Sequence, residues 1–126
     1  MVKEDYIMRL IHEAVRTLLK LLFGIEEQKK EEFEFADAKM EELYRRLKQM
    51  AHKGQINEAE NLLSEVLDKE QKEGFALALF FYEELNDLEE EALEQAGFSR
   101  EEIQEGILAA ARLYGYDGMV SALLSQ

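Results

Sequence analysis

The chain has 126 residues, the usual length of one domain, and 47% of them are hydrophobic, which excludes a disordered chain. Its 28 acidic residues outnumber its 15 basic ones and give a formal net charge of −13. Nucleic acids and anionic membrane surfaces carry the same sign of charge, so this balance excludes general nucleic-acid binding and makes membrane binding unfavourable. The sequence has no cysteine, so disulfides and thiolate chemistry are excluded too.

The first predicted element is an apolar helix over about residues 5–23. Its charged residues Arg9, Glu13, Arg16 and Lys20 follow spacings of one helical turn, so only a narrow face meets water. They also interrupt the apolar run, and we therefore predict no membrane span, which needs about 20 largely uncharged residues, and no signal peptide. A cytoplasmic location follows as an expectation.

The apolar face of this helix is wider than one neighbouring helix covers. Its candidate interface residues, for a protein partner or for a homodimer, are Ile7, Ile11, Leu18 and Leu22. Two such helices can approach because this segment is nearly neutral, whereas the helical body over residues 31–126 is acidic. Two alternatives remain: the helix is sandwiched within its own monomer, or its basic residues meet lipid headgroups in a peripheral membrane role.

Glycine rather than proline separates the later helices, because the sequence contains no proline. A heptad-like apolar seam predicts a second helix over about residues 31–53, and a third begins at the cap Asn57. The fourth opens with residues 75–82, which are apolar on every side and must be enclosed by other helices. A short fifth helix covers about residues 88–96.

The sixth helix has a capping-box signature, formed by Ser99 and Glu102. Gly115 ends it, Asp117 caps a last helix, and Gly106 is the glycine that falls inside a periodic segment. No segment shows the alternation of a strand. The sequence therefore predicts an all-α fold with six or seven helices in a single domain, 1–126, as a compact bundle or a short right-handed superhelix.

Residues 40–73 resemble a single tetratricopeptide unit. Gly54–Ala59 stands where that family places its inter-helix turn and small contact residue. Leu47 occupies a position that is usually small, and Val66 replaces a common alanine. The resemblance implies stacked helix pairs, and an irregular bundle is the alternative.

Five short stretches follow in order along nearly the whole chain: Asp5–Arg9, Leu22–Gly24, Ile56–Glu60, Phe98–Ile103 and Leu113–Gly115. Together they resemble the landmarks of a bacterial, all-helical family of unknown function from Gram-positive anaerobes. The resemblance implies a helical fold and a bacterial cytosolic setting. It implies no activity and no catalytic or binding residue.

The titratable residues form no pattern of known chemistry. His12 and His52 stand outside the Glu-x-x-His and His-Glu-x-x-His ligand patterns, and neighbouring glutamates on a helix do not face one another. We therefore predict no catalytic residue, no metal, no cofactor and no enzymatic activity. The aromatic run Phe80–Tyr82 lines either the core or a small-molecule pocket between helices.

These patterns favour a cytosolic protein-interaction or assembly module, although they do not identify its partner. The alternatives are peripheral membrane association through the first helix and a small-molecule-binding helical domain.

Overall fold

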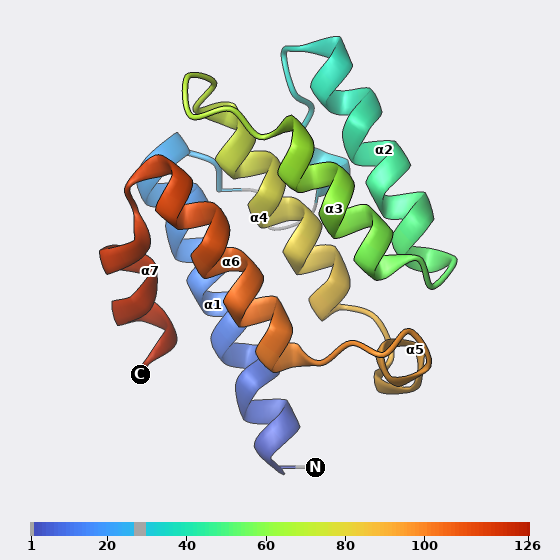
Figure 1. Ribbon diagram of the computed structural model, residues 1–126. Coiled ribbons are helices and arrows are strands. Elements are labelled where there is room, and N and C mark those ends of the chain that lie inside the picture. The colour runs from blue at the N-terminus through green and yellow to red at the C-terminus, as the bar shows by residue number, and fades with distance from the viewer. Residues whose placement is uncertain (1, 27–29) are drawn as a thin grey trace.

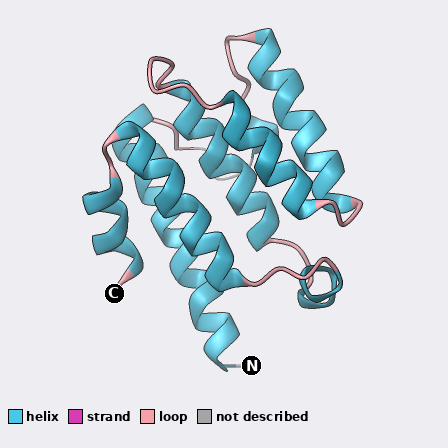
Figure 2. Ribbon diagram, in the orientation of Figure 1, coloured by secondary structure: helices cyan, strands magenta, loops and turns pink. Residues whose placement is uncertain are grey.

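The computed structural model describes residues 2–26 and 30–126, and in this part of the chain all regular structure is helical. Figure 2 shows helices joined by loops, so the predicted all-α fold is confirmed. The elements are α1 (Val2–Phe23), the 3-10 helix η1 (Lys30–Glu32), α2 (Ala38–His52), α3 (Ile56–Val66), α4 (Glu73–Asn86), α5 (Glu90–Gln95), α6 (Arg100–Tyr114) and α7 (Asp117–Leu124).

Helix α4 lies at the centre, with α1 and α6 against one side and α2 against another (Figure 1). Every side chain of its apolar run is buried, from Phe75 at 0% exposure to Tyr82 at 4%. A helix that is apolar all round has to be enclosed in this way, and the prediction for residues 75–82 is confirmed. The burial extends to polar residues of its last turn, Glu83 and Asn86.

Helix α1 packs against three neighbours, α4, α6 and α7. Together they cover its wide apolar face, so Ile7, Ile11 and Leu18 are at most 8% exposed and Leu22 is partly buried against the core. The expectation that these side chains face outward is therefore wrong, and α1 is sandwiched within its own fold. Self-association stays a prediction, but these residues do not present a free surface for it.

Helix α2 begins at Ala38 rather than near residue 31. The side chain of Asp37 accepts a hydrogen bond from the Lys39 N–H, which caps the helix there. Before the cap, Phe33 and Phe35 leave the helical path and pack against the ring of Phe80 in the core. The apolar seam thus continues across a loop, which explains the misplaced helix start.

Lys30 holds this loop onto α2. Its ammonium group pairs with Glu41 at 2.8 Å and donates to the carbonyl oxygen of Phe33 at 2.7 Å. The rings of Phe33, Phe35 and Tyr44 surround it at 5.1–5.7 Å, a distance at which cation–π attraction operates.

Helices α2 and α3 pack together as a pair joined by a short turn. Helix α3 begins at Ile56 with Gln55 as its N-cap, so the predicted cap at Asn57 is wrong. The backbone reason lies in the turn, where the Gln55 N–H donates to the Met50 carbonyl and brings Ile56, 1% exposed, directly into the core. The tetratricopeptide likeness of this pair stays a prediction.

Helix α6 begins with the predicted capping box. The side chain of Ser99 accepts from the Glu102 N–H, and the Glu102 carboxylate accepts from the Ser99 N–H at 3.0 Å. The helix ends at Gly115, whose φ of 81° is left-handed, as predicted. The predicted cap of α7 is wrong, because Asp117 is the first residue of that helix and Tyr116 precedes it as the N-cap.

Ser99→Ala is expected to lower the free energy of unfolding by about 1 kcal/mol, because it removes the acceptor for the Glu102 N–H. Glu102→Ala should lower the free energy of unfolding by less, since the Glu102 side chain only accepts the reciprocal hydrogen bond from the Ser99 N–H. Ser121→Ala, an exposed serine inside α7, serves as the control and should change stability by less than about 0.5 kcal/mol. Denaturant melts measure all three, and equal losses for Ser99→Ala and Ser121→Ala would contradict the role of the cap.

Candidate functional site

A groove of about 300 Å³ opens between α3 and α6, and α4 lies beneath it. The two flanking helices run in the same direction across the central one (Figure 1). The groove is lined by one side of each flanking helix and by a single residue of α4: Glu60, Asn61, Leu63, Ser64, Leu67, Tyr82, Gly106, Ala109, Ala110 and Leu113.

Small residues form most of the α6 wall of this groove. One of them, Gly106, has to be glycine because of the Tyr82 side chain that forms the floor of the groove. A Cβ atom added at Gly106 would overlap the Cζ and the hydroxyl oxygen of Tyr82. Glycine at this position therefore allows the buried Tyr82 ring to lie against the α6 backbone. From there the hydroxyl group of Tyr82 crosses beneath the groove and donates to Glu60 of α3 at 2.6 Å.

The Glu60 end of the groove is electronegative. Burial raises the pKa of Glu60, the negative charges of Glu102 and Glu105 raise it further, and the hydrogen bond from Tyr82 acts in the opposite direction. Burial and the nearby carboxylate also raise the pKa of Tyr82, so its hydroxyl stays a proton donor. This end of the groove therefore favours a positively charged group.

The other end of the groove is apolar. Leu67 at the end of α3 is partly buried, and Leu113 on α6 is 42% exposed. Between the two ends, Ser64 and Ala109 face the solvent with short side chains. The groove is thus acidic at one end, lined by short side chains in the middle and apolar at the other end.

Residues 1–115 match the model of a family of unknown function, DUF6483. The chain belongs to this family. The prediction from the five stretches, an all-helical family of unknown function, is confirmed, while the bacterial source stays a prediction. No curated protein and no solved structure matches the chain. Because the function of the DUF6483 family is unknown, the function of this chain has to be inferred from the groove and its surroundings.

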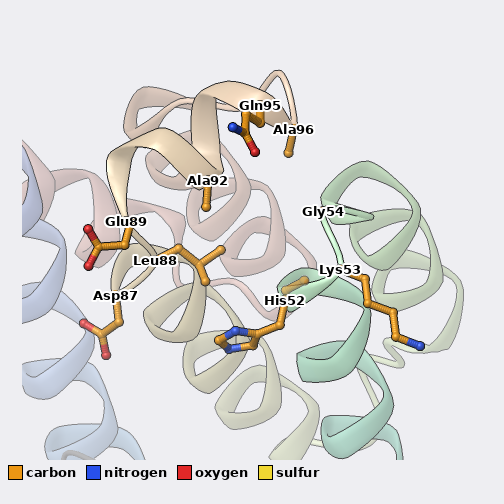
Figure 3. Close-up of a pocket in the computed structure, with 10 residues that line it drawn as sticks. His52, Lys53, Gly54, Asp87, Leu88, Glu89, Ala92, Gln95 and Ala96 are labelled. Carbon is orange, nitrogen blue, oxygen red and sulfur yellow. The ribbon is translucent and has the colours of Figure 1, made fainter.

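A second, larger hollow of about 630 Å³ lies between the end of α2 and the segment formed by the α4–α5 connection and α5 in this DUF6483 chain. Figure 3 shows His52 of α2 below Leu88, with Asp87 across from it and Gln95 and Ala96 above. His52 Nε2 is paired with Glu84 at 2.6 Å. Among the described residues no group of three or more potential ligands is placed to hold a metal ion, and the hollow is an open, mixed polar surface.

His12 of α1 pairs with Glu83 of α4, whose side chain is only 10% exposed. Burial raises the pKa of Glu83 to about 7. Burial alone would lower the pKa of His12, but the hydrogen bond and the negative charge of Glu83 outweigh it and raise that pKa. The second carboxylate oxygen of Glu83, Oε1, is buried without a hydrogen-bond partner among the described residues. The pair therefore holds a proton at the junction of α1 and α4.

The sequence-predicted residues and the groove residues barely overlap. Phe80 and Phe81 lie in the core, and from the predicted aromatic run only Tyr82 reaches the groove. The interior glycine of the sixth helix was the one available signal for the groove, because a glycine inside a helix often marks a close approach of other atoms. Glu60 and Leu113 had no signal of their own.

Proposed function

We propose that this member of DUF6483 is a cytoplasmic protein-interaction module that docks a segment of a partner protein in the α3–α6 groove. The observation that carries the proposal is the groove between two parallel helices, which has the short, exposed side chains of Ser64 and Ala109 in its middle and the exposed Leu113 at its end. A partner side chain can approach both helix backbones there, as in complexes in which a peptide lies in a groove between helices. The volume of about 300 Å³ suits a few side chains rather than a folded domain.

A peripheral membrane role has less support. An interfacial helix needs a free apolar face to bury among the lipids, and the face of α1 is covered by α4, α6 and α7. Within the described residues, none of the helices is both long enough and apolar enough to cross a bilayer.

Site-specific crosslinking tests the proposed docking site. The chain has no cysteine, so Ala109→Cys gives a single position to which a benzophenone maleimide can be attached. Irradiation in an extract of the cells that make the protein is expected to give one defined adduct from this position. Arg16→Cys, at an exposed position of α1 and outside the groove lining, is the matched control and should give none.

A second substitution shows whether the adduct depends on the groove. Leu113→Glu places a charge at the apolar end of the groove, on a side chain that is already 42% exposed, so the fold should persist. The adduct from Ala109→Cys is expected to disappear in this background. An adduct that persists there, or that forms equally from Arg16→Cys, would contradict docking in the groove, and an adduct of two copies of the chain would favour self-association.

A further inference from the structure

We infer that the segment bound in the α3–α6 groove carries an arginine or lysine that docks on Glu60, and an apolar side chain that docks between Leu67 and Leu113. This inference rests on the proposed function of the groove and specifies the chemistry of the partner. The groove is negatively charged at one end and apolar at the other, and the helix fixes the spacing between the two ends.

The acidic end brings together carboxylates from two different helices. Glu60 stands on α3, and Glu102 and Glu105 on α6 lie close enough to act on its charge. The Glu102 carboxylate is engaged with Ser99 in the capping box, and of these three carboxylates it is Glu60 that belongs to the groove lining and faces a ligand. Burial is the main cause of the raised pKa of Glu60, and the negative charges of Glu102 and Glu105 add to it, so a cation bound beside Glu60 would offset this repulsion.

Tyr82 prepares Glu60 for that cation. Its hydroxyl group donates to Oε2 of Glu60, which fixes the carboxylate at the rim of the groove. A guanidinium group can then approach in the plane of the carboxylate, the geometry in which arginine binds most strongly, and an ammonium group can bind as a point charge.

The spacing of the two ends limits the length of the segment. Glu60 lies in α3 and Leu67 directly follows its last residue, so a rise of 1.5 Å per residue places them about 10 Å apart along the helix axis. That distance corresponds to about two turns of a bound helix or to about three residues of an extended strand. A short linear segment therefore reaches both ends.

Charge distinguishes this partner from the other occupants. A second copy of the chain would bring its own net charge of −13 against the acidic end. A small polyamine would neutralise the carboxylates but would leave Leu113 without a partner. A basic and apolar protein segment satisfies both ends at once.

Selection of random peptides displayed on phage, with the whole chain as bait, tests the inference. We expect enriched sequences in which an arginine or lysine lies a few positions from a leucine, methionine or phenylalanine. One enriched peptide is then synthesised with a fluorophore, and its affinity is measured by fluorescence polarisation. Glu60→Gln should weaken binding about tenfold and flatten its dependence on ionic strength, since the amide still accepts from Tyr82 but has no charge.

Two variants complete the comparison. Glu65→Gln makes the same charge change on α3 at an exposed residue outside the groove lining, and it should leave the affinity unchanged. Leu113→Glu should abolish binding. Circular dichroism and thermal melts confirm that each variant is folded.

Enriched peptides without basic residues, no enrichment at all, or equal affinities for wild type and Glu60→Gln would overturn the inference. If wild type and Glu60→Gln bind the peptide equally but Leu113→Glu does not bind it, the proposed docking groove is still supported and only the basic residue of the segment is wrong. Binding that survives both Glu60→Gln and Leu113→Glu would place the peptide elsewhere and remove both proposals. Spermine that binds with the same Glu60 dependence, but is indifferent to Leu113→Glu, would show a small-cation site instead.

Discussion

Gly106→Ala is expected to lower the free energy of unfolding by about 2 kcal/mol, although alanine is the better helix former by about 1 kcal/mol. The added methyl group would overlap the ring of Tyr82, which is 4% exposed and cannot swing into solvent. Displacing an enclosed ring costs about 1–3 kcal/mol. The hydrogen bond from its hydroxyl group to Glu60 would be lost as well, at about 1–3 kcal/mol for a buried polar group left unpaired.

Gly118→Ala is the matched control. Gly118 lies in the first turn of α7, and a Cβ atom added there meets nothing within 4 Å. The same change should therefore leave stability unchanged or raise it by up to about 1 kcal/mol, because alanine reduces the freedom of the unfolded chain. Denaturant melts of the two variants should move in opposite directions, and a Gly106→Ala variant at least as stable as the wild type would show that the Tyr82 ring relaxes freely.

The local features of the fold were within reach of the sequence. The Ser99 cap and the Gly115 helix end depend on side chains and backbone within one or two turns, and both lie where they were predicted. The enclosure of α4 also followed, because an apolar run has only one stable environment in water. Such predictions need no knowledge of which helices are neighbours.

Besides the two misplaced caps at Asn57 and Asp117, two larger errors have a common physical origin in tertiary packing. The width of the apolar face of α1 was read correctly, but periodicity does not tell how many helices cover it, and three of them bury Leu18 completely. The start of α2 was misplaced because Phe33 and Phe35 belong to the core without belonging to a helix. Apolar spacing alone cannot separate these two situations.

The candidate site was out of reach for a related reason. Its walls come from α3 and α6, which are separated in the chain by two other helices, and its floor comes from Tyr82 of one of those two. Neither wall has an unusual sequence by itself. Glu60 becomes distinctive only when Glu102 and Glu105 are placed opposite it by the fold.

The buried pair of His12 and Glu83 should make stability depend on pH. Both pKa values are raised in the folded chain, so the folded state binds protons more tightly than the unfolded state. The stabilisation is complete below pH 4.5, the ordinary pKa of a glutamate, and is lost as the pH rises through about 7. Glu13, Glu84 and Asp87 act on the pair in the same direction, because their negative charges favour the protonated forms.

His12→Ala is expected to lower the free energy of unfolding by about 3 kcal/mol at pH 8 and by clearly less at pH 5, because it leaves the Glu83 carboxylate buried without its partner until that group is protonated. Glu83→Gln, in contrast, should weaken the pH dependence, since the amide does not titrate. His52→Ala removes one partner of the neighbouring Glu84, which keeps the hydrogen bond from the Tyr44 hydroxyl. The His52 side chain is 50% exposed, so this change should cost less than about 1 kcal/mol at either pH. The overall acidity of the chain acts on all of these variants alike, so urea melts at the two pH values isolate the contribution of the pair. If His12→Ala and His52→Ala lower the free energy of unfolding by the same amount at pH 8, the core does not shield the charged Glu83 carboxylate from solvent. Burial of that carboxylate is then not what sets its pKa.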